Sequence, residues 1–164
     1  MQVLISDSNV LIDLYVVNQL DNMFKLPFAF TVPDILFEEE LKTNHSNLTD
    51  LGLNVMVLDS ETIKYTFQLS EKYDKPGRID LFALALAKNV GCPLLTGDMD
   101  LRKAAEEESV ALYGTVWVIE QLVISEIITI ADAYRLYDEM KEKKRRLPWE
   151  VAAIRLKEIE EQYI

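Results

Sequence analysis

The stretch RIDLFALALAKNVGCPLLTGDMDL, from Arg78 to Leu101, decides the predicted fold. Its first half is apolar on almost every side, which predicts a buried helix with Asp80 in the first turn, where free backbone N–H groups favour an anion. Gly91 is expected to end this helix. The apolar run PLL at 93–95 fits a buried parallel strand, and Asp98 lies in the turn after it. Open α/β sheets bind ligands at that edge, so both acids are candidate site residues.

Length and composition predict one globular domain over residues 1–164, with 49% hydrophobic and 27% charged residues and no low-complexity tract. Apolar strand patterns alternate with helical patterns up to about residue 113, whereas residues 114–164 contain helical patterns only. We therefore predict an α/β fold with three layers, α/β/α, around a central mostly parallel sheet in residues 1–113. A C-terminal helical extension follows over residues 114–164.

Two simple features bear on location and chemistry. No apolar run approaches the roughly 20 residues of a membrane span, and no basic leader precedes the first strand, so we expect a cytoplasmic protein without a membrane partner. The single cysteine, Cys92, excludes an internal disulfide framework. The single histidine, His45, is in a polar segment that we interpret as a loop. These two residues are too few for a zinc site of the His/Cys type, which leaves carboxylate chemistry.

The formal net charge of −11 disfavours a surface that holds nucleic acid by bulk electrostatics. It is compatible with a nuclease, because acids that bind divalent cations are neutralised by them. The one dense basic cluster, residues 141–146, has two open interpretations: a helix C-terminus favoured by positive charge, or a contact with nucleic acid or an acidic partner. The glutamates at 106–108 are expected to form a solvated face, with Arg102 and Lys103 at helical spacing as partners.

Acidic residues follow several of the predicted strands and could meet at one edge of the sheet. Each acid alone also has a structural interpretation, as a helix cap or a turn residue. The acids are Asp7 after the first strand, Glu38 or Glu39 on the helix after Pro33, Asp80, and Asp98 with Asp100. Carboxylates held together repel unless cations screen them, and hard oxygen ligands suit Mg²⁺ or Mn²⁺. A pair of such ions would activate a water for in-line attack on a phosphodiester.

Three motifs give the sequence a resemblance to a known family. They are ISDSNVLID at 5–13, RIDLFALALA at 78–87 and LLTGDMDL at 94–101. The chain resembles the PIN-domain family, which includes the VapC-type toxins of toxin–antitoxin pairs and several RNA-processing nucleases. The resemblance covers roughly residues 3–113 and implies a fold built on a central parallel sheet.

The resemblance also implies roles for single residues. Asp7, Asp80 and Asp98 match the first, third and fourth acids of the family, and Glu39 is the better match to the second, with Glu38 as the alternative. Ser8 or Asn9 matches the hydroxyl or amide neighbour of the first acid, Thr96 matches the threonine beside the fourth, and Asp100 is at most an accessory ligand. The resemblance implies a Mg²⁺- or Mn²⁺-dependent endoribonuclease that cuts single-stranded RNA, and the toxin of a toxin–antitoxin pair is its expected role. An antitoxin protein and a second copy of the chain, forming a homodimer, are the expected partners.

Two other functions fit parts of the pattern. The first is a catalytically weak PIN-like module that binds proteins, for which the C-terminal helices would provide a surface. The second is a phosphoacceptor domain, which would need a lysine beside its aspartate. Lys88 lies at the far end of its predicted helix from Asp80, which disfavours this function.

Overall fold

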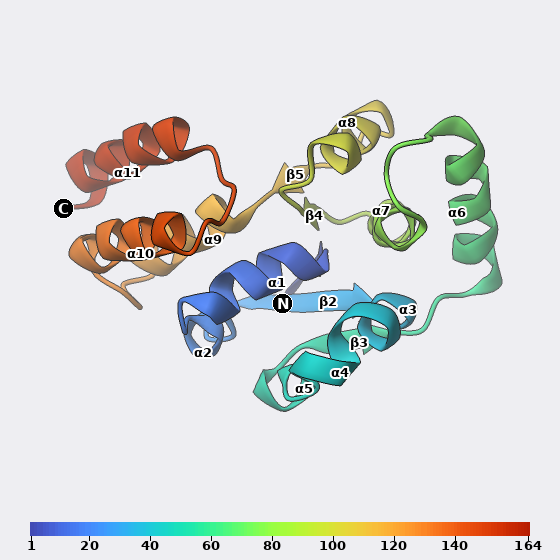
Figure 1. Ribbon diagram of the computed structural model, residues 1–164, viewed down its shortest axis with the longest axis horizontal. Coiled ribbons are helices and arrows are strands. Elements are labelled where there is room, and N and C mark those ends of the chain that lie inside the picture. Colours follow the sequence, from blue (N-terminus) through green and yellow to red (C-terminus); the bar gives the residue numbers. More distant parts are fainter.

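The computed structural model describes residues 1–164 and contains one sheet of five parallel strands in the order β3-β2-β1-β4-β5 (Figure 1). Ile5 of the central strand is in register with Thr31 on one side and with Leu94 on the other. The parallel pairing throughout confirms the predicted central sheet. The strands are β1 (Gln2–Ser6), β2 (Phe28–Pro33), β3 (Asn54–Met56), β4 (Leu94–Leu95) and β5 (Leu112–Tyr113).

Helices connect the strands and continue the chain after β5, as the alternating pattern predicts. Up to β5 they are α1 (Ser8–Val16), α2 (Leu20–Met23), α3 (Asp34–Leu36), the π-helix η1 (Phe37–Leu41), α4 (Lys42–His45), α5 (Leu48–Leu51), α6 (Ser60–Lys72), α7 (Arg78–Val90) and α8 (Met99–Glu107). The extension consists of α9 (Thr115–Ile124), α10 (Ile130–Glu142) and α11 (Trp149–Tyr163). No helix combines the length and apolar character that crossing a membrane requires.

The helices cover both faces of the sheet, which confirms the three-layer α/β/α fold. The chain steps from β1 to β2 to β3 and then crosses to β4, so right-handed connections place α1 and α7 on opposite faces. On one face α7 packs against β1, β2 and β4, while on the other α9 packs against α1 and α2. Figure 1 shows α9, α10 and α11 gathered at the end of the molecule away from α6.

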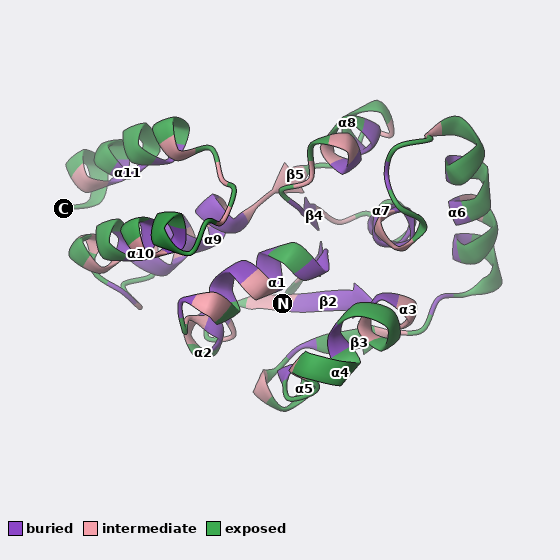
Figure 2. Ribbon diagram, in the orientation of Figure 1, coloured by how far each residue is buried: buried purple, intermediate pink, exposed green.

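Helix α7 is the buried centre of the fold, as its sequence predicts. Every residue from Leu81 to Ala87 is buried, and Figure 2 shows the contrast with the largely exposed α6. The helix ends at Gly91, whose φ of 78° lies in the left-handed region that glycine adopts without penalty. Burial of this run on all sides explains why the helix carries almost no polar residues between its two ends.

The direction of the strand order reverses between β1 and β4. The backbone N–H of Asp7 donates to the carbonyl oxygen of Leu95 at 2.9 Å, so the carboxyl ends of these two strands lie side by side. Such a reversal leaves a crevice at the carboxyl edge of the sheet, because the connecting helices leave it in opposite directions. The residues that follow β1 and β4 are therefore placed at the usual ligand site of an open α/β sheet.

The C-terminal helices are anchored on α1 by part of the basic cluster 141–146. Asp13 of α1 is buried and accepts hydrogen bonds from Thr115 and Arg145, both at 2.6 Å. Lys143 donates to the carbonyl oxygen of Val16 at 2.7 Å, and Lys141 lies over the ring of Trp149, the first residue of α11. These contacts assign a structural role to much of the cluster.

Two sequence-based expectations about polar segments are wrong. The segment around His45 is helical up to His45, as the short helix α4, and is not a loop there. The imidazole packs edge-on against Tyr15, with 4.7 Å between ring centroids. Glu108 is not part of a solvated face. Its carboxylate accepts hydrogen bonds from Tyr65 and Tyr73, both at 2.6 Å, and from Lys72 at 2.9 Å, and these bonds join α6 to the end of α8.

Candidate active site

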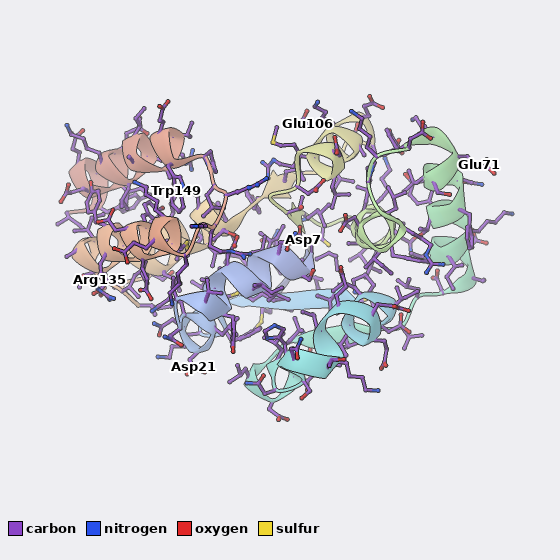
Figure 3. All side chains as sticks on the ribbon, in the orientation of Figure 1. Asp7, Asp21, Glu71, Glu106, Arg135 and Trp149 are labelled. Carbon is purple, nitrogen blue, oxygen red and sulfur yellow. The ribbon has the colours of Figure 1, made fainter.

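Asp7 lies at the junction of β1 and α1, at the end of α1 that faces β4 and α7 (Figure 3). Its side chain is 1% exposed, caps α1 by accepting from the N–H of Val10 at 3.0 Å, and accepts from the hydroxyl of Thr96 at 2.5 Å. Burial raises the pKa of this carboxyl to about 7 although both hydrogen bonds lower it, and the charges of Asp80 and Asp13 raise it further. The surroundings of Asp7 therefore disfavour its charged form, and a bound cation would neutralise that charge.

Asp80 lies in the first turn of α7, where the apolar helix begins. Burial is the largest cause that raises its pKa to about 6, followed by the negative charges of Asp98 and Glu40. The backbone N–H of Gly77 acts in the opposite direction, because it donates to the charged form. The charge of Asp80 acts on Asp7, and the charges of Asp98 and Glu40 act on Asp80. These four acids therefore form one electrostatic cluster, which we call the acid cluster.

Thr96 and Asp98 connect this cluster to α8. The hydroxyl of Thr96 accepts from the backbone N–H of Asp98 at 3.1 Å while it donates to Asp7. Asp98 caps α8 by accepting from the N–H of Leu101 at 2.8 Å. Asp100 lies in the first turn of the same helix, and its charge is not among those that raise the pKa values of Asp7 and Asp80. The turn after β4 thus fixes Asp98 beside Asp7 and leaves Asp100 apart.

The glutamates after Pro33 are arranged differently from the prediction. Ser8 donates from its hydroxyl to Oε1 of Glu40 at 3.2 Å, which places Glu40 at the start of α1 beside Asp7. Glu38 instead pairs with Lys42 at 3.0 Å on the exposed surface, and Glu39 is exposed without a hydrogen bond or an ion pair. The structure therefore brings Glu40, and neither Glu39 nor Glu38, to the acid cluster.

The physical reason is the π-helix η1, which contains all three glutamates. A π turn holds an additional residue, so it rotates every following side chain relative to a regular α-helix counted from Pro33. Leu36 and Leu41 on either side of the glutamates are fully buried, which fixes the two ends of this turn in the core. The run of three identical glutamates gives no local signal of this shift, and so the sequence favoured Glu39.

The acid cluster fits a divalent cation in its chemistry and only in part in its geometry. Its donors are carboxylate oxygens, which hard cations such as Mg²⁺ and Mn²⁺ prefer. Burial and, after it, the neighbouring negative charges raise the pKa values of Asp7 and Asp80, and a bound cation would offset both effects. No three His, Cys, Asp or Glu side chains of the structure are, however, arranged as a ready metal site. The carboxylate oxygens of Asp7 and Asp98 are turned toward Thr96 and toward helix N–H groups.

Comparisons with known proteins agree on one fold. A family model described as a PIN domain matches residues 3–161. A solved structure, that of a PilT N-terminus domain protein from the hyperthermophilic archaeon Sulfolobus solfataricus P2, is 16% identical in sequence. It superimposes with a TM-score of 0.52 and covers 72% of this chain and 90% of that chain, which shows a shared fold. No curated protein matches the sequence.

Proposed function

Because this chain belongs to the PIN-domain family, whose members are generally nucleases, we propose that it is a divalent-metal-dependent endoribonuclease that hydrolyses single-stranded RNA. The observation that best supports this proposal is the acid cluster, which lies where the strand order reverses. Four acids from four separate segments influence one another's charge there, and the pKa values of Asp7 and Asp80 are well above the ordinary range for aspartate. A purely structural set of helix caps would not need acids that repel one another.

In this proposal Asp7, Asp80, Asp98 and Glu40 would hold Mg²⁺ or Mn²⁺, and the ion would supply an activated water and stabilise the departing oxygen of the phosphodiester. The chain's own contribution is positioning. The hydroxyl of Thr96 holds one oxygen of Asp7, and that of Ser8 holds one oxygen of Glu40. The Thr96 hydroxyl lowers the pKa of Asp7 and so favours the ionised form that a cation needs.

The proposed set of ligands differs from the sequence-based one at a single position. Glu40 takes the place of Glu39 because only Glu40 contacts Ser8 and influences Asp80. Glu38 is engaged with Lys42, and Asp100 stays at most an accessory ligand. The remaining residues of the predicted site keep the roles that the resemblance implied.

The proposal is tested by cleavage of a fluorescently labelled single-stranded RNA with Mn²⁺, with and without a chelator. Asp7→Asn and Asp98→Asn are suitable variants, because asparagine also caps helices and the two helix starts should therefore be preserved. We expect both to lose cleavage by a factor of about 100 or more. Asp21→Asn, an exposed acid in α2, is the matched control and should cleave like the wild type. Wild-type rates in Asp7→Asn or Asp98→Asn would contradict the proposal.

A catalytically weak module that binds proteins is the second candidate function. It is favoured by one observation, the absence of three acid side chains arranged to hold an ion. Calorimetric titration with Mn²⁺ separates the two functions. A nuclease should bind the ion with heat that disappears in Asp7→Asn, whereas a weak module should show no heat that depends on this carboxylate.

The biological setting is proposed from the family resemblance alone. We propose that the chain is the toxin of a toxin–antitoxin pair, that an antitoxin protein binds it and that it forms a homodimer. Light scattering of the purified protein gives its molar mass, which should be twice the 18.9 kDa of one chain. Growth arrest on expression, lost in Asp98→Asn, would support the toxin role.

A further inference from the structure

A pocket of about 920 Å³ opens where the C-terminal helices meet the carboxyl edge of the sheet. Its inner wall contains Thr96 and Asp98, and its outer wall is built by α9, the segment before α11 and the start of α11. The volume lies in the upper part of the roughly 300–1,000 Å³ range of ligand sites in proteins. The pocket therefore adjoins the acid cluster directly and has room for more than a single ion.

The lining of the pocket is unusually rich in arginine for such an acidic chain. Three of the six arginines of the chain line it, namely Arg102, Arg146 and Arg155, against two acids, Asp98 and Glu120. The chain as a whole has a formal charge of −11. The pocket is thus a local positive site on a negative protein, which would attract an anionic ligand that the rest of the surface repels.

Two of these guanidinium groups are fixed by bonds to the protein. Glu120, which is 1% exposed, accepts from Arg155 through both carboxylate oxygens at 2.7 and 2.8 Å. Arg102 donates to the carbonyl oxygens of Thr96 at 2.5 Å and Tyr113 at 3.3 Å. Each arginine keeps further N–H groups that these bonds do not use, and such groups match the geometry of a phosphate.

The third arginine is free. Arg146 is exposed and has no carboxylate within 4.0 Å, in contrast to its neighbour Arg145, which pairs with Asp13. Neither Arg102 nor Arg146 is therefore neutralised by an acid of the protein. A ligand with negative charge would supply the missing partner for both.

An apolar part of the lining lies beside the arginines. Trp117 is stacked on Tyr113 with ring centroids 4.1 Å apart and an angle of 9° between the planes. Leu147 and Val151 contribute aliphatic surface, and the side chain of Val151 is largely exposed. Planar bases and charged phosphates alternate along a single strand of nucleic acid, and grooves that bind such strands combine the same two kinds of surface.

We propose that this pocket binds one or two nucleotides of the single-stranded RNA next to the phosphodiester that is cut. Arg146, Arg155 and Arg102 would contact phosphate oxygens, and the apolar wall would face a base. The inference rests on the proposed function, since Asp98 belongs to both the acid cluster and the lining of the pocket. It assigns a substrate-binding role to the C-terminal helices.

Binding can be measured without cleavage by fluorescence anisotropy of a labelled single-stranded oligoribonucleotide in the presence of a chelator. Arg146→Gln is the informative variant, because this side chain makes no bond whose loss would unfold the protein. We expect its affinity to fall about 5- to 10-fold at low salt, and the slope of log K against log salt to become shallower by about 0.7, the value for one lost contact on a single strand.

Lys144→Gln is the matched control, because Lys144 is exposed, lies two residues from Arg146 and is not part of the pocket. It removes the same charge and should change the affinity by less than about twofold. Equal losses in Arg146→Gln and Lys144→Gln would overturn the proposal, since they would indicate bulk electrostatics.

Two further outcomes separate this proposal from the proposed function. A wild-type protein that binds the oligonucleotide through Arg146 but does not cleave it with Mn²⁺ would support the pocket and contradict the nuclease. A wild-type protein that cleaves RNA, together with an Arg146→Gln variant that binds and cleaves normally, would support the nuclease and contradict the pocket. If the wild type does not bind the oligonucleotide at all, the pocket is not an RNA site, and a protein segment becomes the alternative ligand.

Discussion

Thr96 and Asp7 are joined by a hydrogen bond from the threonine hydroxyl to Oδ2 of the aspartate, across the two neighbouring parallel strands at which the strand order reverses. The same hydroxyl accepts from the N–H of Asp98. One side chain thus links the first and the last acid of the cluster. It also opposes the effect of burial, because a donor to the charged carboxylate lowers the pKa of Asp7.

Replacing Thr96 with valine should raise the pKa of Asp7 above its value of about 7, because the hydrogen bond that favours the ionised form is lost. The acid limb of Mn²⁺-dependent cleavage should then move to higher pH by about one unit. The pH dependence of kcat/KM measures this shift. Thr96→Ser keeps the hydroxyl and should restore the wild-type profile, whereas coinciding profiles for Thr96→Val and the wild type would refute the role of Thr96.

The metal-free protein should lose stability as the pH rises from about 4 to 8. The pKa of Asp7 is about 7 in the folded state and 3.8 when unperturbed, so the folded state binds the proton more tightly. The proton on Asp7 stabilises the folded state fully below pH 3.8, and this contribution is lost as the pH rises through about 7. It amounts to at most about 4 kcal/mol. Asp80, with a pKa of about 6, acts in the same direction.

Urea denaturation at several pH values checks this prediction. Asp7→Asn mimics the neutral side chain and should flatten the pH dependence, so that the variant becomes more stable than the wild type at pH 8. Asp21→Asn, which changes an exposed acid of α2, should follow the wild-type curve. Parallel curves for Asp7→Asn and the wild type would show that Asp7 is not the group responsible.

Glu40→Gln should reduce cleavage more than 10-fold, whereas Glu39→Gln should leave it within about twofold. Only Glu40 accepts from Ser8 and adds its charge to that around Asp80. The two variants differ by one position on the same π-helix, so each is the control for the other. A larger loss in Glu39→Gln would return the second acid to the position that the sequence favoured.

Gly91→Ala should lower the free energy of unfolding by about 1–2 kcal/mol, because alanine would have to adopt the left-handed backbone of this residue, with φ at 78°. No atom lies within 4 Å of the position of the added Cβ, so the whole effect is conformational. Gly97→Ala also has open space and no positive φ, and should change the stability by less than about 0.5 kcal/mol. Equal effects in a denaturation experiment would contradict this explanation.

The sequence predicted the sheet and most of the acid cluster because both depend on local signals. The apolar run of α7 can be accommodated only inside the fold, and an acid directly after a buried strand must lie at the carboxyl edge. Asp7 and Asp98 were found in this way, and Asp80 from its place at the start of α7. The PIN-domain family was recognised from the same three segments, and the comparison with known families confirms it.

The features that the sequence did not predict depend on packing between distant residues. The choice of Glu40 is made by the π turn between Leu36 and Leu41, which the core imposes. Asp13 pairs with Arg145 and not with Arg146, so Arg146 is left without a carboxylate partner at the pocket. Neither the position of Glu40 nor the unpaired state of Arg146 can be predicted from the local pattern of apolar and polar residues.

The side-by-side placement of β1 and β4 also has a consequence for folding kinetics. Asp7 and Thr96 are 89 residues apart in the chain, so their strands meet only after a long loop has closed. That step adds Asp98 to the acids that follow β1 and β2, and with it part of the repulsion within the acid cluster. Raising the pH should therefore slow the docking of β4 in the metal-free chain, and a cation that bridges the acids would speed the same step.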